Sequence, residues 1–179
     1  NQYNQEILNP KSDFYNFSPD ITFLILDIRN LLGDYFYFPY SISSAERKSL
    51  VKEKINELEN LILQFKNNSS SKLVITNFNI TSYSPNGIIE TKSEFGFHEM
   101  IHELNKSLKS IAKNQNSIYV YDFNQFVSKH GEKNIFDYKQ FHIGDIQIAF
   151  NYIPYLAHEL MGYVKPMFGI NRKCIVLDL

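Results

Sequence analysis

The chain has 179 residues, of which 44% are hydrophobic, and this length suits one domain with a substantial core better than two full domains. The 18 basic and 19 acidic residues leave a net charge of −1, which argues against the broad positive field of a nucleic-acid-binding protein. The single cysteine, Cys174, excludes an internal disulfide. No apolar stretch is long enough to span a bilayer and the N-terminus has no signal-peptide pattern, so we expect a soluble, cytoplasmic protein without a membrane partner.

Apolar runs typical of buried strands alternate with segments that have apolar residues at helical spacing. The long first helix has Ser43 and Glu46 placed as a capping box, and the last helix is expected to stop before Pro166. In chain order the predicted elements are a strand at 21–28, a helix at 43–66, a strand at 72–79, a helix at 97–113, a strand at 117–124, a helix at 147–163 and a strand at 173–179.

This alternation predicts an α/β fold with a mostly parallel sheet, in which right-handed crossovers place helices on both faces. Ligands of open α/β sheets bind beyond the carboxyl ends of the strands. The polar residues at these predicted ends are therefore candidate ligand-binding residues: Asp27, Arg29 and Asn30 after the first strand, Asn77 and Asn79 after the second, and Asp122 and Asn124 after the third.

Each of these residues also has a purely structural interpretation. Asp and Asn at strand ends commonly cap the following helix or turn. Arg29 carries a permanent charge, so it must either pair with an acid, for which Asp27 and Asp122 are candidates, or bind an anionic ligand. The run NFNITSYSP, which begins at Asn77, offers amides and hydroxyls for an oxyanion or a polar substrate, or it forms a loop that satisfies itself.

The histidines do not form an evident site by their spacing. His98 and His102 match the H-E-x-x-H pattern of zinc proteases on a helix, but no third ligand is apparent. The apolar stripe of that helix must face inward, so we interpret both histidines as part of a solvated face. His142 lies in a predicted loop before the last helix, where a catalytic or binding histidine is plausible.

The final residues KCIVLDL resemble the first strand of a haloacid-dehalogenase (HAD) phosphatase domain, which ends in an Asp-x-Asp-x-Thr motif. By this resemblance Asp178 matches the nucleophile that forms an aspartyl-phosphate and also binds Mg²⁺. The chain stops one residue before the second aspartate of the motif. The alternative is that Asp178 merely ends an ordinary strand.

Most of the chain resembles the N-terminal region of FkbH-like proteins, the HAD-IIIC group. The matching segments are SPDITFLILDIRNLL, NFNITSYSPNGI, SEFGFHEMIHELN, VYDFNQFVSKHG and YIPYLAHELMGYVKP. This region is similar to SGNH hydrolases, which form a flavodoxin-like three-layer α/β/α sandwich. The resemblance implies an SGNH-like domain at residues 1–168, with its first strand and helix upstream, and a linker plus the first HAD strand at residues 169–179.

The chain departs from the catalytic blocks of SGNH hydrolases. It has no Gly-Asp-Ser block, Arg29 stands where the oxyanion-hole asparagine would fall, and Gln147 or Ile148 is nearest the position of the catalytic histidine. Without that serine and its base the Ser-His mechanism of ester hydrolysis has no machinery here. We therefore expect this fragment to be inactive alone and to need no cofactor of its own.

FkbH-like proteins are associated with transfer of a glyceryl unit from a phosphorylated glycolytic acid to an acyl carrier protein. The resemblance implies that the whole protein is a Mg²⁺-dependent HAD-type phosphatase or acyltransferase, and that this domain positions the substrate or the carrier. Arg29 would bind a phosphate or carboxylate, assisted by Asn77, Asn79 and His142. The alternative is a non-catalytic domain that binds protein or carbohydrate through its many aromatic residues, which make up 15% of the chain.

Overall fold

The computed structural model describes residues 2–144 and 146–170, and groups the chain into two compact units, residues 1–125 and 126–179. Unit 1 contains a parallel sheet and the two longest described helices. Its elements are α1 (Gln2–Leu8), α2 (Asp13–Phe17), β1 (Ile21–Leu24), α3 (Ile28–Leu32), α4 (Asp34–Tyr37), the 3₁₀ helix η1 (Pro39–Ser41), α5 (Ser44–Asn68), β2 (Lys72–Thr76), the 3₁₀ helix η2 (Gly87–Lys92), α6 (Phe97–Lys113) and β3 (Ile118–Tyr121).

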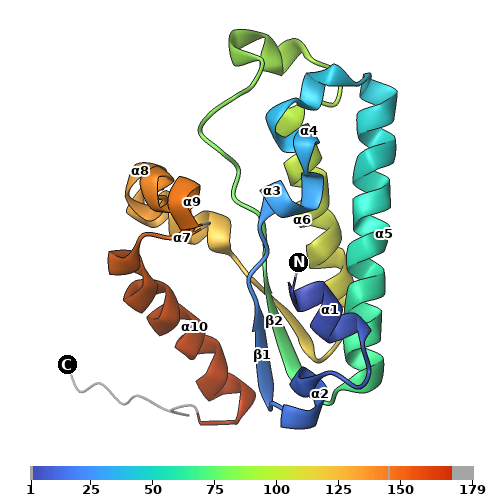
Figure 1. Cartoon of the computed structure of the whole chain (residues 1–179), viewed down its shortest axis with the longest axis vertical. Helices are drawn as coiled ribbons and strands as arrows, with labels where there is room; N and C mark the ends of the chain where they lie inside the picture. Colours follow the sequence, from blue (N-terminus) through green and yellow to red (C-terminus); the bar gives the residue numbers. More distant parts are fainter. Residues whose placement is uncertain (1, 145, 171–179) are drawn as a thin grey trace, which may run out of the picture. The chain divides into compact units, whose positions relative to one another are not determined.

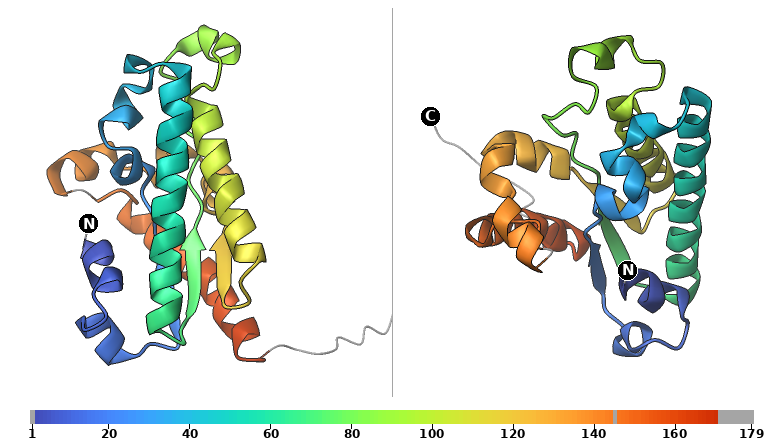
Figure 2. Two further views of the ribbon diagram at one scale, coloured as in Figure 1. Left: turned by 90° about the vertical axis from the view of Figure 1, so that its right-hand side faces the viewer. Right: turned by 45° about the horizontal axis from the view of Figure 1, so that its top comes forward.

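The three strands of unit 1 pair in the order β1-β2-β3, all parallel, with Ile21 opposite Lys72 and Leu73 opposite Ile118. Two successive right-handed crossovers in one direction place both crossover helices on the same face of a sheet. Figures 1 and 2 show α5 and α6 side by side over that face. The mixed α/β fold with a parallel sheet is therefore confirmed.

The core of unit 1 lies between this face of the sheet and the two helices. Leu73 and Ile75 of β2 are fully buried, and α6 buries the stripe predicted from its sequence. Helix α5 adds a complementary stripe, so the burial of apolar area drives the packing of the crossover helices. The inward residues of the two helices are Val51, Leu58, Leu61, Ile62, Phe65, Phe97, Met100, Ile101, Leu104 and Leu108.

Helix α5 begins at the predicted capping box, in which the Ser43 hydroxyl accepts from the Glu46 amide and the Glu46 carboxylate accepts from the Ser43 amide. Helix α6 has the predicted bounds. The strands are shorter than predicted because the main-chain groups beyond them form hydrogen bonds with side chains instead of with a neighbouring strand. The amide of Leu26 donates to Thr76 Oγ1 at 2.8 Å, and the main chain of Phe78 bonds to Asn105 instead of to a strand.

Unit 2 is helical in its described part. Its elements are α7 (Phe123–His130, which begins in unit 1), α8 (Glu132–Ile135), α9 (Tyr138–Gly144), the 3₁₀ helix η3 (Phe150–Tyr152) and α10 (Ile153–Met167). The predicted strand at 173–179 and Asp178 lie outside the described residues. None of the helices in the described ranges has the length and apolarity needed to cross a membrane.

The prediction of a helix from 147 to 163 was wrong at both ends. Residue Ile148 forms an isolated antiparallel bridge with Phe136, and the helix begins later, with Pro154 in its first turn, where the missing amide costs no hydrogen bond. At the other end the helix includes Pro166 and stops one residue later. A proline in the last turn removes only one intrahelical bond, so it did not end the helix where expected.

The prediction that His142 lies in a loop was also wrong, because this residue belongs to helix α9. The N-terminus of this helix is capped by Asp137, whose carboxylate accepts from the amides of Lys139 and Gln140 at 3.0 and 3.1 Å. An aspartate that binds the first free amides of a helix is a favourable N-terminal cap. His142 therefore lies on a helix of unit 2 and not on a strand-end loop.

Candidate functional site

The carboxyl end of β1 carries an arginine that is held by a neighbouring acid. Asp27 caps helix α3 by accepting from the Arg29 amide at 2.9 Å, and the same carboxylate binds the Arg29 side chain through both of its oxygens. The Nε···Oδ1 distance is 3.0 Å, and both side chains are about 13–14% exposed. This two-point contact fixes the plane of the guanidinium group. Of the two acids considered from the sequence, Asp27 is a partner of Arg29.

The carboxyl ends of β2 and β3 are joined by side chains that bind one another. Asn77 Nδ2 donates to Asp122 Oδ1 at 2.9 Å, and Asn77 Oδ1 accepts from the Asn124 amide at 3.0 Å. Asp122 also accepts from the Gln125 amide at 2.9 Å and so caps α7. Asn77 thus bridges two adjacent strand ends, and its amide has well-formed partners on both of its polar atoms.

The four residues after β2 are held by amides from other parts of unit 1. Asn105 of α6 accepts from the Phe78 amide and donates to the Phe78 carbonyl, both at 2.8 Å, as a neighbouring strand would. Asn124 Oδ1 accepts from the Ile80 amide at 3.0 Å. Between these two residues, Asn79 is 8% exposed, and its side chain forms no hydrogen bond with the described residues. Its amide is not among the fully buried polar atoms that lack a partner, so it keeps access to solvent and can bind a water molecule or a polar ligand.

Three of the predicted site residues, Arg29, Asn77 and Asn79, therefore come from adjacent strand ends of unit 1. His142 belongs to unit 2, and Asp178 lies outside the described residues. The ligand-binding role of these five residues stays a prediction. Asn105 was missed from the sequence because it lies in the middle of an amphipathic helix, where a polar residue is ordinary.

A second polar cluster, also missed from the sequence, lies at the N-terminus of α6. The Glu90 carboxylate accepts from the Tyr40 hydroxyl, from Ser84 Oγ at 3.0 Å and from the His98 amide at 3.2 Å. The Tyr40 hydroxyl in turn accepts from the Phe97 amide at 3.2 Å. A Cβ atom at residue 96 would lie 2.5 Å from Glu90 Oε1, so the close approach of this carboxylate requires Gly96.

The charges of this cluster follow from its contacts. Burial alone would raise the pKa of Glu90, but the hydrogen bonds from Tyr40, His98 and Ser84 lower it below the ordinary value. Burial and the neighbouring carboxylate raise the pKa of Tyr40. Glu90 is therefore an anion seated on the first free amides of a helix, a position that the helix dipole favours. The cluster fastens residues 84–98 to η1.

Arg47 of α5 is 5% exposed and binds three main-chain carbonyl groups. Its nitrogens donate to Ile42 at 2.6 Å, Phe95 at 2.9 Å and Glu94 at 3.0 Å, and its guanidinium lies 4.8 Å from the centre of the Tyr40 ring. These contacts solvate the buried cation in place of water. Arg47 therefore joins the N-terminus of α5 to the chain that leads into α6.

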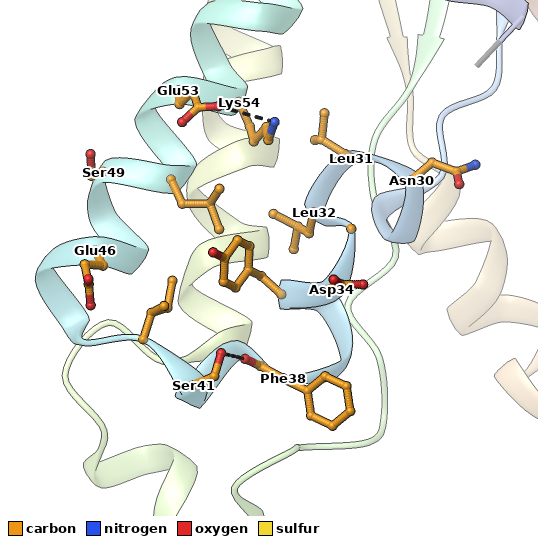
Figure 3. A pocket seen from close by; sticks show the side chains of 14 residues that line it. Asn30, Leu31, Leu32, Asp34, Phe38, Ser41, Glu46, Ser49, Glu53 and Lys54 are labelled. Carbon is orange, nitrogen blue, oxygen red and sulfur yellow. Dashed lines mark hydrogen bonds and ion pairs between the residues drawn. The ribbon is translucent and has the colours of Figure 1, made fainter.

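A groove of about 880 Å³ opens in unit 1 between the α3–α4 turn and the first turns of α5 (Figure 3). Gly33 makes that turn with φ 58° and ψ −134°, a conformation that favours glycine. Apolar side chains and four charged ones contribute to its lining. They are Leu31, Leu32, Tyr35, Phe38, Ile42, Leu50, Asp34, Glu46, Glu53 and Lys54.

The zinc-protease interpretation of His98 and His102 finds no support in the geometry. His102 is exposed, and His98 Nε2 lies 3.2 Å from the Tyr83 carbonyl. Across the described ranges, no three side chains of His, Cys, Asp or Glu come together as a metal site would require.

Comparison with known proteins agrees with this architecture. A solved structure, the N-terminal part of the protein BF1531 from Bacteroides fragilis containing a phosphatase domain complexed with Mg, superposes with a TM-score of 0.83 at 21% identity. The match covers 100% of this chain and 46% of that chain, and at this identity it shows the fold alone. No curated protein matches this chain. The family model described as FkbH, N-terminal domain, matches residues 1–165, and the chain therefore belongs to the FkbH N-terminal domain family.

Proposed function

We propose that this domain positions a phosphorylated small-molecule substrate or an acyl carrier protein for a HAD-type phosphatase or acyltransferase domain of the same protein. The observation that carries the proposal is Arg29, whose guanidinium is oriented by Asp27 at the sheet edge where α/β proteins bind ligands. Asn79, a buried amide from the adjacent strand end, supplies further hydrogen-bonding capacity. The family membership and the phosphatase domain of the structural neighbour add support.

Within this proposal the reaction is transfer of a glyceryl unit from a phosphorylated glycolytic acid to the carrier. Asp178 is the nucleophile and a ligand of Mg²⁺, and acts only in the company of the HAD domain. His142 is proposed as a further substrate-binding residue. The domain at 1–168 is itself without hydrolase activity, and the protein acts in the cytoplasm.

The proposal is tested by Arg29→Ala in the full-length protein, with the phosphorylated acid, Mg²⁺ and the carrier supplied. A charge-assisted hydrogen bond is worth about 1.5–3 kcal/mol, so loss of the guanidinium should raise KM by roughly 10- to 100-fold. Phosphate release and the intact mass of the carrier measure the reaction. Lys109→Ala, which removes an exposed cation of α6, is the control and should leave KM unchanged.

The second candidate function is a non-catalytic domain that binds protein or carbohydrate. It is favoured by the self-paired strand ends, since Arg29 binds Asp27 and Asn77 binds Asp122 and Asn124. The same experiment separates the two functions. If Arg29→Ala lowers the unfolding temperature but leaves the KM and kcat of the full-length protein unchanged, the strand ends are structural and the positioning role is rejected.

A further inference from the structure

The lining of the groove between α3–α4 and α5 contains more acidic than basic residues. Asp34 lies on α4, and Glu46 and Glu53 lie on α5, so each wall of the groove carries acidic residues (Figure 3). Lys54 is the one basic residue among the lining residues described. Its ammonium is held at 2.7 Å by Glu57 and at 3.5 Å by Glu53, so its charge is locally balanced.

The same groove exposes apolar side chains to solvent. Phe38 is 69% exposed on the rim, and Tyr35 is 37% exposed. Leu50 is half-buried on the α5 wall between the two acids. Another molecule that covers these neighbouring apolar side chains in the groove would gain free energy from their burial.

The spacing of the α5 wall points to a helical ligand. Glu46, Leu50 and Glu53 are separated by four and three residues, so they follow one another along a single face of the helix. A second helix laid along this face would meet an acid, an apolar residue and an acid in turn. An amphipathic helix binds in this way, with its apolar residues in the groove and its charges on the rim.

We propose that this groove binds an amphipathic, basic helix of a partner protein. The apolar residues of that helix would cover Phe38 and Leu50, and its lysine or arginine side chains would contact Asp34, Glu46 and Glu53. An acidic helix would meet like charges on both walls and be repelled. The groove thus selects partners by charge and presents the apolar surface that holds them.

The test uses a fluorescent helical peptide built from leucine and lysine at amphipathic spacing, and a second peptide in which glutamate replaces every lysine. Fluorescence anisotropy with the 179-residue chain measures binding. We expect the lysine peptide to bind, with an affinity that falls as salt is added, and the glutamate peptide not to bind. Equal affinity for both peptides, or no binding of the lysine peptide, would overturn the proposal.

Variants of the groove locate the binding. Asp34→Asn combined with Glu53→Gln should weaken the lysine peptide about fivefold, since two exposed ion pairs contribute about 0.5 kcal/mol each. Phe38→Ser should weaken it roughly tenfold through lost apolar burial. The matched control is Glu103→Gln on α6, which removes an acid paired with Lys106 at 3.2 Å outside the groove. If the groove variants bind as tightly as this control, the peptide binds elsewhere and the proposal fails.

Discussion

Replacing Asn105 by alanine tests whether the carboxyl end of β2 depends on a side chain of α6. Asn105 makes two hydrogen bonds of 2.8 Å to the main chain of Phe78, one as donor and one as acceptor. Each hydrogen bond stabilises a protein by about 1 kcal/mol, and a buried polar group left without a hydrogen-bond partner costs up to about 3 kcal/mol. The lost bonds should therefore lower the free energy of unfolding by about 2 kcal/mol, and by more if water cannot reach the part-buried Phe78 main chain.

The matched control is Asn60→Ala, at an exposed position inside α5. Both substitutions gain up to about 0.7 kcal/mol of helix propensity, so the difference between the two variants isolates the contribution of the bonds to Phe78. Urea unfolding is followed by far-UV circular dichroism and by the fluorescence of the 12 tyrosines, since the chain has no tryptophan. Amide hydrogen exchange at Phe78 should also become faster in Asn105→Ala alone.

Equal urea midpoints for Asn105→Ala and Asn60→Ala, with unchanged protection of the Phe78 amide, would contradict this prediction. The loop after β2 would then be held by its own conformation, and Asn105 would be an incidental neighbour. The orientation of Asn77 and Asn79 would have to be explained without a contribution from α6.

Two further predictions concern Arg47 of α5 and Glu90 at the N-terminus of α6. Arg47→Met should lower the free energy of unfolding by about 4.5 kcal/mol, because three hydrogen bonds from a charged donor are lost at about 1.5 kcal/mol each. Arg47→Lys should cost about half as much. Equal urea midpoints for wild type and Arg47→Met would contradict this. Because the pKa of Glu90 is lowered in the folded protein, its carboxylate stabilises the fold at pH values above the ordinary pKa of 4.5. This stabilisation is lost as the pH falls through the pKa of the folded state. Glu90→Gln should therefore lower the free energy of unfolding by about 1 kcal/mol at neutral pH and by little at acid pH. The urea midpoints of wild type and variant should converge as the pH is lowered. A difference in midpoint that stays the same at both pH values would contradict this prediction.

The features that the sequence predicts correctly depend on residues close together along the chain. Ser43 and Glu46 of the capping box are three positions apart, and the apolar stripe of the helix at 97–113 follows helical spacing, so both could be recognised without knowing the fold. The alternation of apolar runs with amphipathic helices likewise predicted parallel strands. The start of α10 was misplaced because Ile148 pairs with Phe136, a contact that periodicity does not reveal.

The class of fold, the two crossover helices and the polar residues at the strand ends could all be predicted from the amino-acid sequence alone. Which of these polar residues bind one another depends on how the chain packs in three dimensions. Asn77 and Asp122 are 45 residues apart, and Tyr40 and Glu90 are 50 apart. A helix or a strand is specified by neighbours along the chain, but the partner of a buried polar group is whichever atom the packing of the sheet and helices brings within about 3 Å, and that distance does not exist until the chain has folded.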